Sequence, residues 1–450
     1  MSQQEPATDR SASGKLSALG PTWLAGAIAA GPATIASLVV AGASFGYALL
    51  WVVIVSALFG ALAQYLSTKL ALATEEGLVA TVERRFGSMW AWLLVADVVL
   101  AAGFAQLIIM KTLADVSGLL TGIDARIWGV GWAVVLAVGL AGGGYRLAEL
   151  GAKLLVSAIV VAFILSLVVV PTDLAAAAGG LVPAIPAGVD GALVAAGILG
   201  GAVHITIITM QTYTVRARGW TTADAGLARF DIGVSMLAAF GIFSIAIFLV
   251  AAGALFGTVD AEGLTAVAAG QALEPIAGAF AQRLFLAGLL GAAVSTLGGN
   301  TLVPPYVIAD KLGWDIDVSD NRYRWLLAAT ALLSATGAFI GGSFLQQLVL
   351  VLAVGTVGTP FVLAVVLVLL NDTDTAADAP GPLLNAGGGV VFVVASVLAG
   401  SFVESQLGGG LTPLSGGVLA FALLLGVATV LLVGSYFRTR LAANSTVVSE

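Results

Sequence analysis

The chain contains 450 residues, of which 59% are hydrophobic and only 10% are charged. Soluble domains carry about 25% charged residues, so this composition excludes an ordinary water-soluble protein. The absence of cysteine excludes disulfides, thiolate metal sites and thiol catalysis. The net charge of −7 argues against nucleic acid as a partner.

Apolar stretches of about 20 residues recur along the chain, separated by charges and turn residues, and predict membrane-spanning helices. Strand-like alternation is absent over most of these stretches, so the predicted fold class is an all-α integral membrane protein. In chain order, the twelve predicted spans cover residues 21–45, 47–71, 89–120, 127–143, 148–170, 191–213, 230–256, 276–312, 325–340, 345–370, 386–402 and 411–436.

The positions of Lys and Arg predict the orientation, because basic residues near span ends stay in the cytoplasm. With a cytoplasmic N-terminus, every basic residue except Lys111, Arg126 and Arg283 falls at or near the cytoplasmic face. The predicted outer loops at 171–190 and 257–275 contain acidic residues and no basic residue. We therefore expect a multi-pass protein of the cell membrane.

Two predicted spans contain residues that interrupt a regular helix. Gly31 and Pro32 lie near the centre of the first span, and proline removes a backbone donor and clashes with the preceding turn. In the sixth span, Gly200 and Gly201 come just before His204. Interruptions at corresponding places in two halves are typical of inverted-repeat transporters, whose substrate binds between the broken helices. Glycine that merely packs helices together is the alternative.

Polar side chains follow both predicted breaks. His204 is the only histidine, and a neutral imidazole at this depth can coordinate a divalent cation or carry a proton. Thr34 and Ser37 follow the first break, and Thr206 and Thr209 follow His204. In the alternative interpretation, the histidine bonds a neighbouring helix and the hydroxyls bond carbonyls four residues earlier.

Backbone carbonyls at the breaks, such as those of Ile28, Gly31 and Gly201, are further candidate ligands. No carboxylate lies within either break, although hard divalent ions normally need anionic oxygen. The sequence contains no phosphate-binding loop, no dinucleotide fingerprint and no nucleophile elbow. We therefore expect neither an enzyme nor a protein that binds a cofactor.

Acidic residues inside the spans are few. Asp97 in the third span and Asp231 at the start of the seventh are candidates for a proton relay or for bonds between helices. For Asp231 a position at the membrane interface is the stronger alternative. Asp115 is expected to pair with Lys111, which lies four residues earlier on the same helix face.

Several long segments, taken together, resemble one transporter family. The stretch GPTWLAGAIAAGPATIASLVVAGASFGYALLWV aligns without gaps with the first-span pattern of the Nramp family, proton-coupled transporters of divalent transition metals. The segments GGYRLAELGAKLL, GGLVPAIPAGVDGALVAAGILGGAV and ALEPIAGAFAQRLFLAGLLGAAVST are similar to the family's link between spans four and five, its approach to span six and its eighth span. The similarity runs from about residue 20 to 370.

The resemblance implies a LeuT-type inverted-repeat transporter with about 11–12 transmembrane helices. The expected organisation is a cytoplasmic tail at 1–20, a first five-helix repeat at 21–172 and an inverted second repeat at 191–370. Two peripheral helices at 384–436 and a cytoplasmic tail at 437–450 would follow.

The family's metal-binding motifs are altered in this chain. Where the family has Asp-Pro-Gly-Asn in the first span, residues 31–34 are Gly-Pro-Ala-Thr, so Gly31 and Thr34 replace both metal-binding side chains. Where the sixth span has Met-Pro-His, the chain has His204, Ile205 and Thr206. The tenth-span glutamine aligns with Gly358. The two acidic residues of the family's proton pathway in the third span align with Phe104 and Leu107. At another position of this span, where the family also has an acidic residue, the chain has Asp97.

Two functions remain open at this point. The first is transport of a divalent metal cation, bound by Gly31, Thr34, Gly201, His204 and Thr206, with Asp97 and Asp231 as possible relays and only weak proton coupling. The second is transport of a neutral or anionic organic solute. In this interpretation the site has lost its metal along with the family's aspartate, and the helix N-termini favour the carboxylate of a substrate. A sensor that transports nothing is a third, less favoured interpretation. The lipid bilayer is an expected partner in every case.

Overall fold

The computed structural model describes residues 31–142, 146–186, 189–259, 264–376, 379–408 and 413–447. Most of these residues are helical, and no strand occurs among them. The predicted all-α class is therefore confirmed for the described part of the chain. The first half of the first predicted span, with Ile28, lies outside the described residues.

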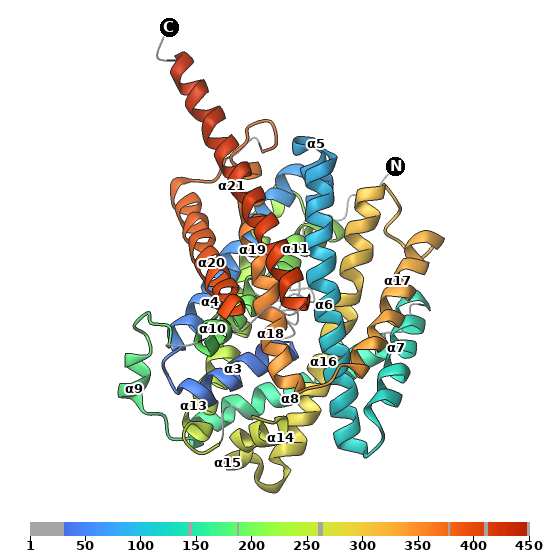
Figure 1. Cartoon of the computed structure of the whole chain (residues 1–450), viewed down its shortest axis with the longest axis vertical. Helices are drawn as coiled ribbons and strands as arrows, with labels where there is room; N and C mark the ends of the chain where they lie inside the picture. The colour runs from blue at the N-terminus through green and yellow to red at the C-terminus, as the bar shows by residue number, and fades with distance from the viewer. Residues whose placement is uncertain are drawn as a thin grey trace, which may run out of the picture.

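The helices fall into long membrane-spanning elements and short connecting ones (Figure 1). In the first half these are α3 (Pro32–Phe45), α4 (Leu50–Thr74), α5 (Leu78–Phe86), α6 (Ser88–Thr121), α7 (Ala125–Gly142), α8 (Arg146–Val169) and α9 (Leu174–Gly179). The next are α10 (Val189–Ala202), α11 (Ile205–Ala217), η1 (Thr222–Asp224), α12 (Ala225–Ile232), η2 (Gly233–Gly241) and α13 (Ile242–Leu255). The remainder are α14 (Ala266–Ala269), η3 (Gly270–Leu273), α15 (Glu274–Ala277), η4 (Gly278–Phe280), α16 (Ala281–Leu312), α17 (Asn321–Leu333), η5 (Ser334–Phe339), α18 (Phe344–Val357), α19 (Thr359–Leu370), α20 (Pro382–Gly408) and α21 (Pro413–Val447).

Ten helical segments of the described chain are long and apolar enough to cross a membrane, and α3 is a shorter apolar helix. The ninth predicted span corresponds to α17 followed by the 3₁₀ helix η5. Helices α5 and α11 lie toward one end of the bundle, whereas α9, α14 and α15 lie at the other (Figure 1). These two ends correspond to the two sides of a membrane.

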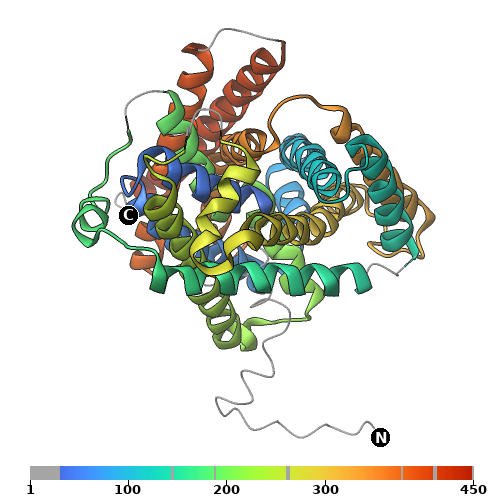
Figure 2. The ribbon, with the colours of Figure 1, turned by 90° about the horizontal axis from the view of Figure 1, so that it is seen from below.

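The sixth span lies at the centre of the bundle and the last span at its edge. Within an apolar 18-residue window of Gly191–Ala217, 83% of the residues are buried in protein, whereas in the corresponding window of Gly416–Arg438 only 22% are. Figure 2 shows α20 and α21 together at one edge, with α7 and α17 at the opposite side. Because exposed apolar side chains on the outer helices face lipid, the functional residues are expected on the central helices.

The tenth span, predicted as one helix at 345–370, consists of two helices. Helix α18 ends at Val357 and α19 begins at Thr359, with Gly358 between them. Pro360 occupies the first turn of α19, where its missing N–H costs nothing but where it cannot continue a helix from α18. Span seven also departs from regular α-helix, since residues Gly233–Gly241 form a π-helix.

The short amphipathic helix α5 ties the ends of several spans together. Arg85 donates two hydrogen bonds to Asp372, at 2.6 and 2.8 Å, just beyond the end of α19. Partial burial alone would raise the pKa of Asp372, but the hydrogen bonds from Arg85 and Thr375 and the charge of Arg85 hold it below the ordinary 3.8. This bidentate pair fixes α5 against α19 on the polar side of the bundle.

The substitution Asp372→Asn should lower the free energy of unfolding at pH 7 by about 0.5–1 kcal/mol, the usual value of a good exposed ion pair. Because the folded-state pKa is depressed, this stabilisation is present above pH 3.8 and is lost as the pH falls through the lower folded value. Thermal unfolding in detergent at pH 7 and pH 3 measures it. Asp374→Asn is the matched control, since Asp374 is 79% exposed and 3.8 Å from Arg85. An equal effect of both substitutions would contradict the assignment.

Candidate functional site

The sixth span is interrupted where the sequence predicts it. Helix α10 ends at Ala202 and α11 begins at Ile205, so Val203 and His204 lie outside both helices. His204 is extended, with φ −129° and ψ 142°, and occupies the N-cap position of α11. Its Nδ1 atom accepts a hydrogen bond from the Thr206 backbone N–H at 3.2 Å and lies 2.8 Å from Thr206 Oγ1. The imidazole therefore caps its own half-helix, and the predicted break is confirmed.

The described part of the first span also begins at its predicted break. Helix α3 begins at Pro32, and Gly31 before it is extended, with φ −62° and ψ 173°. Proline at the first helical position is favourable because its nitrogen needs no hydrogen-bond partner there. Helices α3 and α11 thus both have their N-termini at the same cavity.

The five residues predicted as the binding site line one cavity of about 410 Å³. Gly31 and Thr34 come from α3 and its N-cap, Gly201 from α10, and His204 and Thr206 from the start of α11. All five predicted residues therefore border one volume, which is large enough for an ion with several water molecules.

Other polar residues of the cavity wall were missed by the sequence analysis. Gln64 comes from α4, and Ser295, Thr296 and Asn300 come from α16. Their signal was present in the sequence, because amide and hydroxyl side chains inside apolar spans face the protein interior rather than lipid. Arg218 lines the end of the cavity nearest α5.

Thr296 occupies the space beside Gly31. A Cβ atom at position 31 would lie 2.8 Å from Thr296 Oγ1, so no larger residue fits there unless Thr296 moves. This hydroxyl is buried and has no hydrogen-bond partner among the described residues. The family has an aspartate where this chain has Gly31, and in this structure Thr296 occupies the space that the aspartate side chain would need.

The imidazole of His204 is seated against span ten. A Cβ atom at Gly355 of α18 would overlap His204 Nε2, so only glycine leaves room for the ring in this position. The single hydroxyl proton of Thr359 is shared between two acceptors, the carbonyl of Val203 at 3.3 Å and the carbonyl of Gly355 at 3.2 Å. Span ten thus supports the interrupted backbone of span six.

The hydrogen bonds of His204 are compatible with both neutral tautomers of its imidazole ring. When Nδ1 accepts the Thr206 N–H, the ring proton is on Nε2. When Nδ1 instead donates its proton to Thr206 Oγ1, Nε2 has a free lone pair and can bind a metal, as ligating histidines do when their other nitrogen is held by an acceptor. Thr206 is compatible with both forms.

The two candidate relay acids do not line the cavity. Asp97 is 3% exposed and faces Gly358 at the interruption of span ten, and its Oδ2 has no partner within the described structure. Asp231 is also buried within the protein and pairs with Arg218 at 2.9 Å, and its position relative to the membrane interface stays a prediction. The predicted pair of Lys111 and Asp115 is confirmed at 2.9 Å.

The hydroxyls near the breaks do not all bond their own helices. Thr206 contacts His204, and the buried hydroxyls of Ser37 and Thr209 have no partner in the part of the chain that the structure describes. Nor do three His, Asp or Glu side chains of that part lie close enough to hold a metal ion together. Among the described residues, those that line this cavity could bind a cation only through neutral oxygen and nitrogen atoms.

Interrupted helices around a central cavity are typical of secondary transporters, and the arrangement in this chain is the LeuT-type fold. Solved structures agree. The chain superimposes on the manganese transporter of Eremococcus coleocola with a TM-score of 0.73, at 15% identity over 97% of both chains. With Mhp1, a nucleobase-cation-symport-1 family transporter, the TM-score is 0.57, at 16% identity over 94% of this chain and 92% of that chain.

The sequence pattern described as natural resistance-associated macrophage protein-like matches residues 22–405, and the chain belongs to this Nramp family. The divalent metal cation transporter MntH of Mycobacterium tuberculosis is 29% identical over 362 residues, which cover 76% of this chain and 80% of the relative. MntH of Yersinia pestis is 30% identical over 307 residues, covering 65% of this chain and 74% of the relative.

The substitution Gly355→Ala should displace the imidazole and disturb the cap of α11, because the added methyl overlaps the ring. Since the chain has one histidine, ¹⁵N-histidine NMR reports His204 alone. We expect both ring nitrogen signals to shift in Gly355→Ala. They should stay unchanged in Gly299→Ala, where the same methyl enters the cavity wall without touching any atom. Unchanged signals in Gly355→Ala would contradict this position of the His204 ring against Gly355.

Proposed function

We propose that the chain is a secondary transporter that moves a divalent metal cation across the membrane by alternating access. The observation that carries this proposal is the lone imidazole at the interruption of span six, on the wall of a central cavity, in a member of the Nramp family. The names of its relatives, divalent metal cation transporters, support the same class of cargo.

In this proposal the cation is held by His204 Nε2, the hydroxyl of Thr34 and backbone carbonyls at Gly31 and Gly201. Thr206 positions the imidazole by accepting the Nδ1 proton. Because these ligands are neutral, they offset less of the dehydration of the ion than a carboxylate would. The cation therefore keeps several water molecules, for which the cavity has room.

We further propose that the N-terminus is cytoplasmic and that the protein lies in the cell membrane, on the distribution of Lys and Arg. Segments 21–172 and 191–370 would be the two inverted repeats, flanked by the tail 1–20, the peripheral helices 384–436 and the tail 437–450. By this orientation, the end of the bundle near α5 faces the cytoplasm.

Proton coupling is expected to be weak. The family's acidic pair falls at Phe104 and Leu107, and an uncharged network lies between α6 and α16 instead. Asn300 donates to the Ala102 carbonyl at 2.8 Å and to Gln106 Oε1 at 3.0 Å, and Gln106 bonds Thr301. Asp97 and Asp231 remain the candidates for a residual relay, and neither contacts the proposed ligands.

Purified protein in proteoliposomes should take up Mn²⁺, Cd²⁺ or Mg²⁺, followed with a metal-sensitive dye. His204→Asn should reduce uptake at least tenfold although asparagine is a good N-cap, because the imidazole ligand is lost and the cap is kept. His204→Ala removes both. Normal uptake in His204→Asn would reject the ligand role of His204. Uptake of none of the three ions by the wild type would reject the metal function and favour a neutral or anionic solute.

Restoring the family residues should create a stronger metal site, but only when space is made for them. We expect Gly31→Asp with Thr34→Asn to bind Mn²⁺ more tightly by calorimetry when Thr296→Ala is also present, because Thr296 Oγ1 lies where the new Cβ must go. Thr296→Ala alone is the control and should change affinity little. If the triple variant binds Mn²⁺ no better than the wild type, the position of the site is wrong.

A further inference from the structure

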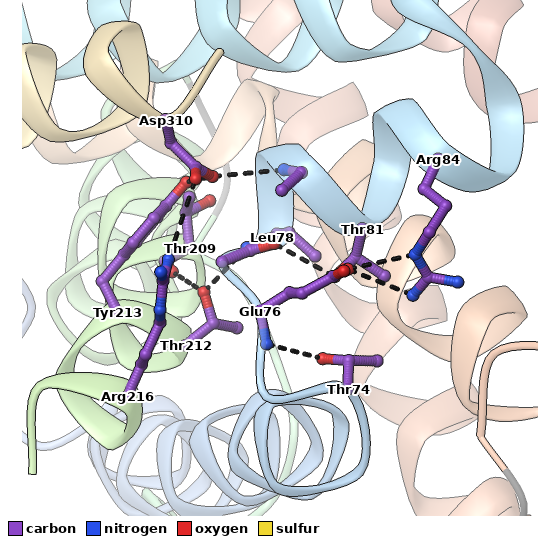
Figure 3. Close-up of polar contacts among 12 residues, drawn as sticks. Thr74, Glu76, Leu78, Thr81, Arg84, Thr209, Thr212, Tyr213, Arg216 and Asp310 are labelled. Atoms are coloured by element: carbon purple, nitrogen blue, oxygen red, sulfur yellow. Dashed lines mark hydrogen bonds and ion pairs between the residues drawn. The ribbon is translucent and has the colours of Figure 1, made fainter. Parts of the chain in front are cut away.

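Helix α11 has two functional faces. Met210, Thr214 and Arg218 follow one another along the face that lines the cavity, from the break toward the end near α5. The opposite face carries Tyr213 and Arg216, which point toward α5 and the end of α16 (Figure 3). The half-helix that borders the cavity is therefore also attached to the surrounding helices.

The attachment is centred on Asp310, near the C-terminus of α16. Its carboxylate accepts a hydrogen bond from Tyr213 Oη at 2.7 Å and one from the backbone N–H of Ala80 in α5 at 3.1 Å. Arg216 of α11 forms a longer ion pair with it, at 3.9 Å. One carboxylate thus joins α5, α11 and α16 (Figure 3).

Neighbouring contacts make this junction close-packed. Thr212 Oγ1 accepts a hydrogen bond from the Leu78 N–H at 3.1 Å, and Lys311 forms an ion pair with Glu83 at 2.9 Å. A Cβ atom at Gly77 would overlap the Tyr213 ring and lie 2.7 Å from Asp310 Oδ2. The side chain of Asp310 is only 8% exposed, so its charge depends on these partners for stabilisation.

The two sides of the junction belong to different moving parts. Helix α11 is one half of an interrupted span, whereas α16 is a long helix that packs mainly on α6 and α8. Alternating access requires the interrupted helices to move relative to such supporting helices. The bonds from Tyr213 and Arg216 to Asp310 cross that boundary, so they stabilise one arrangement of α11 and not the other.

We propose that Asp310, Tyr213 and Arg216 form a latch that holds the transporter in the state whose cavity extends to the end near α5. The proposal rests on the alternating access of the proposed function, and it adds the contact that sets the balance between the two states. Loss of the latch moves α11 from α16 and shifts the population toward the opposite-facing state.

The chain contains no cysteine, so single cysteines report accessibility without background. Met210→Cys lies on the cavity wall toward α5. Ser37→Cys lies on α3 beside Gly197 of α10, one turn beyond Thr34 and on the far side of the break from α11, and Ser37 is fully buried. Rates of maleimide labelling at these two positions report the two states in proteoliposomes without any metal present.

Tyr213→Phe and Asp310→Asn should each raise the labelling rate of Ser37→Cys by about threefold to tenfold, the worth of one such hydrogen bond, and lower that of Met210→Cys. Tyr306→Phe is the matched control, because Tyr306 lies one turn from Asp310 on α16 and contacts the Tyr213 ring only edge-on. It should leave both rates unchanged.

Unchanged labelling in both latch variants, with or without a loss of thermal stability, would overturn the latch. The same holds if Tyr306→Phe shifts the rates equally. Because the labelling needs no cargo, these outcomes do not depend on metal uptake. Failure of the wild type to transport a metal rejects the proposed cargo, and failure of the labelling to shift rejects the latch.

Discussion

The structure depends on one constraint: backbone that leaves a helix within a membrane must find its hydrogen-bond partners inside the protein. At the interruption of span six, His204 accepts the Thr206 N–H and Thr359 donates to the Val203 carbonyl. At the first span, Pro32 begins the helix and removes one donor that would need a partner. His204, Thr206 and Pro32, which belong to these arrangements, also line the cavity, so stability and binding are coupled at this site.

The chemistry of the cavity follows from what this chain has in place of the acidic motif of its relatives. Gly31 and Thr296 fit each other, and the imidazole of His204 fits Gly355, so the altered residues form a closely packed set. The result is a site of neutral ligands beside two helix N-termini, whose dipoles do not favour a bare cation. A partly hydrated ion, whose charge is shared with water, suits this environment better than a dehydrated one.

Much of the fold could be predicted from the sequence. Span positions, the start of α3 at Pro32, the interruption at His204 and the Lys111–Asp115 pair follow from local patterns, since hydropathy, glycine, proline and helical spacing act over a few residues. The interruption at Gly358 was missed because the break is short and the residues on both sides of it form one apolar stretch. Thr296 beside Gly31, and Asp310 between α5 and α11, were out of reach because they depend on contacts between residues distant in the sequence.

The central claim is that the single imidazole of His204 binds the transported metal, and ¹⁵N-histidine NMR during a Cd²⁺ titration tests it most directly. The account predicts a saturable shift of Nε2, with Nδ1 changing from an acceptor to a protonated nitrogen that donates to Thr206. Transport of Cd²⁺ with both nitrogen signals unchanged at saturating metal would contradict it.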